Sequence, residues 1–252
     1  MSHGASAKPD ELVWTPEMVG RFWAHEAKTP ENYFGYQVGM AVVRYMRPHL
    51  AGARRIVDYG AGLGFLVDDL LASGYQCGAV EFGADAVGAL GAKFKGRPGF
   101  LGAWQANQPV NPSERFHAAF LMEVVEHLYD AELRACLENI RALLAPGGLL
   151  LVTTPNEEDL SKSMIMSPET GRLFHRWQHV RSWNEVTLAE ALRQHGFTTL
   201  ECAATDFSCS PAALQRIYPL PLRVLRAGAK RALRLIDRTR KLPHLYAVAR
   251  LA

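Results

Sequence analysis

The segment "VDYGAGLG" at residues 57–64 decides the fold, because three glycines alternate directly after an apolar run. A strand that leads through such a loop into a helix places bare backbone N–H groups and the positive helix end beside one cleft. Glycine has no Cβ, so a ligand can approach this backbone closely. The segment therefore predicts a nucleotide-binding loop, and a glycine-rich turn without a ligand is the alternative.

The spacing of the glycines argues against a dinucleotide fold. The pattern G-x-G-x-x-G, counted from Gly60, needs a third glycine at position 65, and Phe65 stands there. The next apolar run ends at Glu81, where an acid can bind the two hydroxyls of a ribose. The distance between loop and acid fits either type of nucleotide, so these residues disfavour a nicotinamide oxidoreductase without identifying the ligand.

Short apolar runs alternate with helical patterns over most of the chain, which is typical of a mainly parallel sheet with crossover helices. We therefore predict an α/β fold. The helix expected after the fourth run starts at Asp130 as its cap. The seven predicted strands lie at residues 54–60, 75–81, 99–104, 117–123, 148–154, 197–207 and 245–251.

The 252 residues, 48% of them hydrophobic, suffice for one sizeable α/β domain or two small ones. We expect residues 1–50 to form a helical lead-in, with Thr15 as a helix cap and Pro16 after it, and residues 51–252 to form the main domain. Without a signal-peptide pattern or a run of about 18 apolar residues, a cytoplasmic protein is expected. The four scattered cysteines disfavour a disulfide framework and a cysteine metal site.

Four blocks, in this order and at these separations, resemble the class I S-adenosylmethionine-dependent methyltransferases. They are "VDYGAGLG", "AVEFGADAV", "FLMEVVEHL" and "LLAPGGLLLVTTPN". The resemblance covers roughly residues 54–200. It implies S-adenosyl-L-methionine (SAM) as the cofactor. It also implies a Rossmann-like seven-stranded sheet, mainly parallel with an antiparallel last strand, and helices on both faces.

The resemblance also assigns parts of the cofactor to strand ends. The acid and glycines of the first block would lie along the methionine end of SAM, and the acid of the second block would bind the ribose. Many relatives have an acid after the third strand to hold the adenine amino group, whereas this chain has "GAWQANQP". Trp104 by stacking, or Gln105 by hydrogen bonding, is the expected replacement. The implied cofactor site consists of Asp58, Gly60, Gly62, Gly64, Glu81, Phe82 and Glu123.

The fourth strand leads into Glu123, Glu126 and His127, which share one face if the segment turns helical. The carboxyl ends of strands are where open α/β sheets bind ligands. In ubiquinone-pathway O-methyltransferases and small-RNA 2′-O-methyltransferases, such an E-x-x-E-H block resembles a divalent-metal site completed by a later histidine, here His179 or, as second choice, His175. Two carboxylates and two imidazoles suit Mn, Fe or Zn better than Mg. In the alternative, a glutamate faces the cofactor and the histidine only lines the acceptor pocket.

The resulting functional hypothesis is methyl transfer to the oxygen of a small-molecule, glycan or lipid-linked acceptor. His127 is the expected general base or metal ligand, with Glu126 beside it. One alternative is an RNA-end 2′-O-methyltransferase that uses the metal site, and another is a non-catalytic adenosyl-binding protein. No DNA partner is expected.

The segment 211–243 carries nine Lys and Arg residues against one acid, so its net charge is +8 and that of the remaining chain is −5. Within it, residues 221–242 have the pattern of a basic amphipathic helix, with Leu222 and Leu225 on one side. We expect an insertion at about residues 208–243, for which peripheral contact with an anionic membrane surface and binding of a phosphorylated or lipid-linked acceptor are two hypotheses. The alternative is a helix packed on the domain with a solvated cationic face. RNA is disfavoured because no interleaved aromatic residues are present to stack bases.

Overall fold

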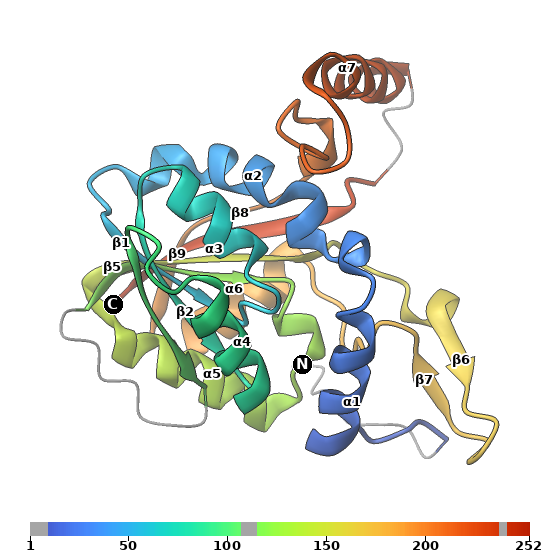
Figure 1. The fold of residues 1–252 in the computed structure, drawn as a ribbon. Helices are drawn as coiled ribbons and strands as arrows, with labels where there is room; N and C mark the ends of the chain where they lie inside the picture. Colours follow the sequence, from blue (N-terminus) through green and yellow to red (C-terminus); the bar gives the residue numbers. More distant parts are fainter. Residues whose placement is uncertain (1–9, 107–114, 237–240) are drawn as a thin grey trace.

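The computed structural model describes residues 10–106, 115–236 and 241–252. Its centre is a seven-stranded sheet in the order β3-β2-β1-β4-β5-β9-β8, with helices on both faces (Figure 1). The pairs from β3 to β5 are parallel, and β9 is antiparallel to both of its neighbours. The predicted Rossmann-like fold and its antiparallel last strand are therefore confirmed. The strands are β1 Arg55–Tyr59, β2 Gln76–Glu81, β3 Phe100–Gln105, β4 Phe116–Met122, β5 Leu144–Pro155, β8 Phe197–Thr205 and β9 His244–Leu251.

Two details differ from the sequence prediction. A small antiparallel hairpin, β6 (Met164–Met166) with β7 (Leu173–His175), follows β5 and was not predicted. Strands of three residues are too short to show a reliable period of alternating side chains. Tyr129, rather than Asp130, occupies the N-cap position of the helix after β4.

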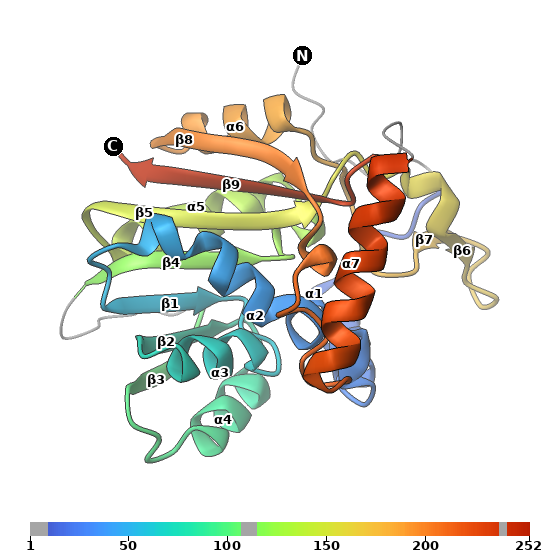
Figure 2. The same ribbon diagram turned by 90° about the horizontal axis from the view of Figure 1, so that it is seen from above.

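Helices cover both faces of the sheet and form two apolar clusters (Figure 2). One cluster joins α5 and α6 to side chains such as Val57, and the other joins α2, α3 and α4 to side chains such as Ile56. These neighbours in β1 point to opposite faces because strand side chains alternate. Each fully buried apolar side chain contributes about 1.5–3 kcal/mol to stability. The helices are α1 Pro16–Glu26, α2 Phe34–Met46, α3 Phe65–Ala72, α4 Ala84–Lys93, α5 Asp130–Leu143, α6 Glu185–Gln194 and α7 Leu220–Ile236.

The predicted start of the first helix is confirmed. The Thr15 side chain accepts a hydrogen bond from the Met18 backbone N–H, and Pro16 occupies the first helical position. The later helix α2 packs directly on α3, where Gly39 leaves room for the carboxylate of Asp69. A Cβ on Gly39 would lie only 2.5 Å from an oxygen of that carboxylate. The N-terminal helices are thus attached to the sheet through α3.

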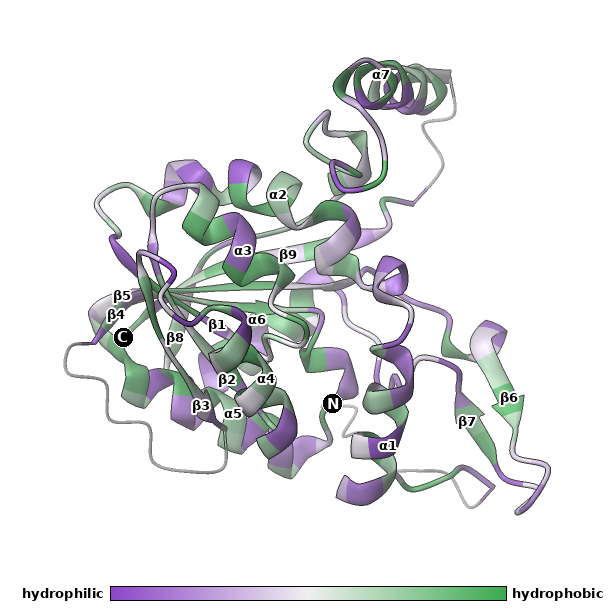
Figure 3. Cartoon of the chain, in the orientation of Figure 1, coloured by the Kyte–Doolittle hydropathy of each residue, from purple (hydrophilic) through white to green (hydrophobic). Residues whose placement is uncertain are grey.

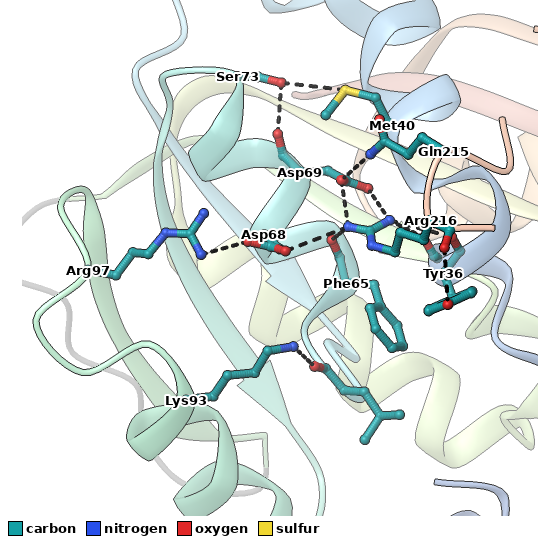
Figure 4. A network of polar contacts seen from close by, with 12 residues as sticks. Tyr36, Met40, Phe65, Asp68, Asp69, Ser73, Lys93, Arg97, Gln215 and Arg216 are labelled. Atoms are coloured by element: carbon teal, nitrogen blue, oxygen red, sulfur yellow. Dashed lines mark hydrogen bonds and ion pairs between the residues drawn. The ribbon is translucent and has the colours of Figure 1, made fainter. Parts of the chain in front are cut away.

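A buried ion pair fixes the segment that precedes α7 (Figure 4). Asp69 is only 2% exposed, and Arg216 donates to its two oxygens over 2.6 and 3.1 Å. Arg216 also donates to the carbonyl oxygens of Gly35 in α2 and Phe65 in α3. Burial raises the pKa of Asp69 to about 6, although the guanidinium opposes this shift. The bidentate pair compensates the buried charge and ties three segments together.

Helix α7 stands apart from the layers of the fold (Figures 1 and 2). It lies between β8 and β9 in the chain and contacts the short helix η5 (Phe207–Cys209). None of the described helices combines the length and the apolar character that crossing a bilayer requires.

Candidate active site

The glycine loop joins β1 to α3 at the carboxyl ends of the parallel strands. Gly60, Gly62 and Gly64 have φ angles of +82°, +51° and +75°, a region that residues with a Cβ rarely adopt. A Cβ on Gly60 would lie 2.5 Å from a methyl group of Val124, and one on Gly64 would lie 2.6 Å from the Phe94 ring. Backbone conformation and close packing together therefore require these glycines.

Two carboxyl groups lie beside the loop and are shielded from water. Asp58 in β1 is 2% exposed, and burial, followed by the charge of Glu81, raises its pKa to about 8. Glu81 ends β2 and accepts a hydrogen bond from the Phe82 backbone N–H. Burial raises the pKa of Glu81, while the N–H groups of Phe82 and Gly62 oppose this shift. Such a partly desolvated carboxyl group is suited to accept hydrogen bonds from two ribose hydroxyls.

The N-terminal helices cover the glycine loop with aromatic rings. Tyr33 lies against Gly62, where an added Cβ would contact its ring at 3.4 Å. The Tyr33 ring also contacts the rings of Trp23 and Phe65, with centroids 6.0 and 6.1 Å apart. Burial raises the pKa of Tyr33 to about 12. The residues before β1 thus form one wall of the site.

The E-x-x-E-H block turns sharply after β4. Glu123 has a φ of +53°, and its N–H donates to the carbonyl oxygen of Thr153 at the end of β5. A single 3-10 turn, Val125–His127, follows. The predicted helical turn is therefore present only from Val125 to His127, and it brings Glu126 and His127, without Glu123, to the carboxyl edge of the sheet.

Glu126 is buried with half of its carboxyl group unsatisfied. Thr154 donates to Oε2 over 2.9 Å, whereas Oε1 has no hydrogen-bond partner within the described part of the chain. This oxygen lies 3.8 Å from Nε2 of His127. Burial, followed by the charge of Glu123, raises the pKa of Glu126 well above its usual range. Burial also raises the pKa of Glu123 to about 8.

His127 and His179 both use Nδ1 for a hydrogen bond within the protein. Nδ1 of His127 lies 3.3 Å from the carbonyl oxygen of Gln178, which can only accept, so Nδ1 carries the proton. Nδ1 of His179 donates to the carboxylate of Glu158. Nε2 of His127 is therefore left with its lone pair. Burial and then the neighbouring His179 lower the pKa of His127 to about 3, which keeps it neutral.

These side chains fit a divalent cation. The ligand atoms of Glu126, His127 and His179 lie within 4.8 Å of one another. Histidines that bind metals usually donate their other N–H to a carbonyl or carboxylate, as both do here. Together with the unsatisfied oxygen of Glu126, they form a mixed N and O ligand set that suits Mn, Fe or Zn. Glu123 belongs to no such group among the described residues, so the structure groups three of the four predicted ligands.

Residues 32–202, more than half of the chain, match the methyltransferase-domain family. The chain belongs to this family. A ubiquinone biosynthesis O-methyltransferase of Paramagnetospirillum magneticum is 26% identical to it over 229 residues, which cover 82% of this chain and 89% of that protein. A protein of the same name from a Bradyrhizobium species is 29% identical over 146 residues, which cover 56% of this chain and 55% of that protein.

Solved methyltransferase structures share the fold. The 1,6-didemethyltoxoflavin-N1-methyltransferase of Burkholderia thailandensis, solved with S-adenosylhomocysteine, has a TM-score of 0.60 at 18% identity and covers 98% of this chain and 94% of its own. The glycopeptide N-methyltransferase MtfA complexed with SAM has a TM-score of 0.56 at 13% identity and covers 86% of this chain and 96% of its own. The protein is a SAM-dependent methyltransferase, and SAM is its cofactor.

The structure distinguishes the two residues that were expected to take the place of an acid on the adenine side of this methyltransferase. Trp104 packs into the core, because a Cβ on Gly78 would lie 2.6 Å from its ring and the Phe116 ring is 6.2 Å away. It is therefore not placed to stack on the cofactor. Gln105 lies opposite Glu81 in the sheet register and donates to the carbonyl oxygen of Phe82. Gln105 is thus the remaining candidate, and residues 107–109 of the quoted stretch lie outside the described residues.

Two residues of the site were missed in the sequence. Glu158 pairs with both His175 and His179, and although burial opposes it, these imidazoles lower its pKa to about 2. Gln178 donates to the carbonyl oxygen of His127 and accepts from the indole of Trp23. Glu158 follows the fifth predicted strand, which neighbours the fourth in this fold, so its position was a usable signal. No signal in the sequence indicated Gln178, because its position depends on the β6–β7 hairpin, which was not predicted.

Proposed function

We propose that this methyltransferase methylates an oxygen atom of a small-molecule or lipid-linked acceptor. The group formed by Glu126, His127 and His179 carries the proposal. It lies next to the glycine loop, since Val124 of the same turn packs on Gly60. Two relatives are named O-methyltransferases of ubiquinone biosynthesis, which favours a phenolic quinone precursor as the acceptor.

Methyl transfer is a displacement at carbon. The acceptor oxygen forms a bond to the methyl carbon while the bond from carbon to the sulfonium breaks, which leaves S-adenosylhomocysteine, and the hydroxyl proton leaves to a base. Alignment of oxygen, methyl carbon and sulfur can contribute about 7–11 kcal/mol. The protein supplies this alignment by holding SAM on the glycine loop and the acceptor near the turn after β4.

The protonation states favour His127 as a neutral ligand over its predicted role as general base. An imidazole with a pKa of about 3 does not retain a proton at neutral pH. Glu126, His127 and His179 would hold a divalent cation, with Gln178 and Glu158 orienting the two rings. Such a cation, when bound, would lower the pKa of an acceptor hydroxyl in contact with it.

Paired acceptors test the proposal. A phenolic quinone precursor and its aniline counterpart, each with and without an isoprenoid tail, are incubated with labelled SAM. We expect label in the phenols and none in the anilines. Methylation of the anilines alone would show a nitrogen acceptor, and methylation of an RNA 3′ end without any phenol product would show the RNA alternative. Either result overturns the proposal.

Metal binding is tested by calorimetry with Mn²⁺ and Zn²⁺. Glu126→Ala is expected to abolish saturable binding, because it removes the carboxylate of the group. The matched control is Glu157→Ala, which removes an exposed acid that pairs with Lys241. Wild-type affinity in Glu126→Ala, or equal losses in both variants, contradicts the assignment.

A further inference from the structure

Helix α7 turns its basic side toward the protein. Arg223, Ala227, Lys230 and Arg234 recur at intervals of three or four residues and so share one face. Ala227 is 3% exposed, and the three cations donate to a carbonyl, a serine hydroxyl and an aspartate within residues 206–211. The alternative of a helix packed on the domain with a solvated cationic face therefore holds only in part, because the helix does pack on the domain but through these cations.

The apolar side of α7 points away from the protein. Leu222, Leu225 and Leu233 lie on the side opposite Ala227, and their exposed fractions are 47%, 68% and 59%. Figure 3 shows strongly hydrophobic and strongly hydrophilic residues on this one helix, which stands clear of the layers. Single exposed leucines are common on protein surfaces, but a row of them along one helix face marks an interaction surface.

The net charge of the segment that contains α7 indicates what kind of partner covers the leucine face of this helix. The segment 211–243 has a net charge of +8, so a symmetric contact between two copies of α7 would bring two strongly positive segments together. Anionic lipid headgroups would instead neutralise them. Arg226 is exposed on α7 next to the leucine face, and a long arginine side chain can reach headgroups while its stem stays in apolar surroundings.

We propose that α7 docks this methyltransferase on an anionic membrane surface, with Leu222, Leu225 and Leu233 inserted at the level of the headgroups. Helices of this kind lie in the plane of the interface, and burial of apolar area and lipid charge both strengthen their binding.

The position of α7 suits this arrangement. β8 enters the segment at the carboxyl edge of the parallel strands, and β9 leaves it at His244, which lies opposite Pro155 at the end of β5. Figure 2 shows α7 at the ends of the strands β5 and β9 that face it. The docked surface would thus lie at the same edge of the sheet as the turn after β4 that carries Glu126 and His127. A lipid-linked acceptor would reach the site from that surface, yet the docking does not depend on the nature of the acceptor.

The test is sedimentation with vesicles of phosphatidylcholine, with and without phosphatidylglycerol. At low salt, we expect the wild-type protein to bind the anionic vesicles about tenfold or more tightly than the neutral ones, and to lose this preference as salt rises. The double variant Leu225→Glu/Leu233→Glu is expected to bind anionic vesicles at least about tenfold more weakly. The matched control is Val186→Glu on α6, where the replaced side chain is 77% exposed, and its binding should equal that of the wild type.

Two results would overturn the proposal: no vesicle binding by the wild type at low salt, or equal binding by the double variant. A wild-type dimer that the double variant converts to a monomer, without vesicle binding, would show that a second copy covers the face.

Thermal stabilisation by S-adenosylhomocysteine verifies that each variant is folded. If the double variant does not fold, Arg226→Gln replaces it and must also weaken anionic binding. Methylation of a soluble phenol should be unchanged in these variants, so this test is separate from that of the acceptor.

Discussion

The proposed cofactor side and the proposed acceptor side of the active site are built in different ways. The cofactor side comes from one continuous stretch, residues 58–82, in which a strand, a glycine loop, a helix and a second strand follow one another. The acceptor side combines Glu126 and His127 after β4, Glu158 after β5, and His179 after the β6–β7 hairpin. The first side depends on backbone conformation and absent Cβ atoms, and the second on the protonation and orientation of side chains.

This difference has a consequence for substitutions. On the cofactor side, an added methyl group changes the backbone and therefore both stability and SAM binding. On the acceptor side, an isosteric change of a single oxygen alters the reaction and leaves the fold intact. Single substitutions on the two sides should therefore separate effects on turnover from effects on stability and SAM binding.

The substitution Glu126→Gln should lower turnover by about 10²–10⁴-fold, the range that assisted proton removal contributes, because it takes away the carboxylate that would hold the cation acidifying the acceptor hydroxyl. SAM affinity should stay unchanged, because the glycine loop is not altered. Steady-state kinetics with the phenolic acceptor, and calorimetric titration with SAM, measure the two quantities. Parallel losses of turnover and of SAM affinity would show that the two sides are not separable.

The substitution Gly60→Ala should destabilise the protein by about 2–4 kcal/mol and weaken SAM binding, since it adds a positive-φ penalty to a contact 2.5 Å from Val124. The matched control is Gly52→Ala, where φ is +83° and an added Cβ meets no atom within 4 Å. Gly52→Ala should lower the free energy of unfolding by only about 1–2 kcal/mol. Urea unfolding measures both values, and equal losses would show that packing at the loop contributes nothing.

The substitution Asp58→Asn should change how stability depends on pH. The pKa of Asp58 rises from 3.8 to about 8 on folding, so its neutral form is favoured in the folded state. Its contribution to stability is complete below about pH 4 and is lost as pH rises toward 8, at up to about 1.4 kcal/mol per pH unit. Urea unfolding without SAM from pH 5 to 8 should therefore show a flatter decline in the variant. Identical slopes would contradict the raised pKa.

The substitution Asn184→Ala should affect stability alone. Asn184 caps α6 in a reciprocal capping box with Thr187, and its loss should cost about 1 kcal/mol. Helix α6 belongs to neither side of the site, so turnover and SAM affinity should equal those of the wild type. A fall in turnover would instead link α6 to the site through Trp183, which is bridged to Asn156 at the end of β5.

The sequence predicts the backbone geometry of the proposed cofactor side because its signals are local. The glycines that follow an apolar run, and the acid that ends the next run, specify their own geometry. Glu158 and Gln178 were missed because their roles arise only when β4 lies beside β5 and when three-residue strands pair. The choice between Trp104 and Gln105 stayed open in the sequence because the neighbours of Trp104, Gly78 and Phe116, belong to other strands.

The basic segment shows the same limit. Its periodicity predicts two faces of one helix, but which face turns toward the protein depends on Asp206 and Ser208 in a distant loop. Arg216 belongs to the same basic stretch, and yet it is largely withdrawn into the pair with Asp69. The net charge of the segment therefore describes the electrostatic potential around it, but it does not tell which protein group each cation contacts.

The pair of Arg216 and Asp69 also marks where a designed deletion can begin. The chain is tied to α2 and α3 through this guanidinium, and it re-enters the sheet at His244. Helix α7 lies between these two fixed points and outside the layers of the fold. A short engineered loop in place of α7 would therefore leave the sheet and its covering helices in place. Such a shortened enzyme is expected to methylate a soluble acceptor without any contact with a membrane.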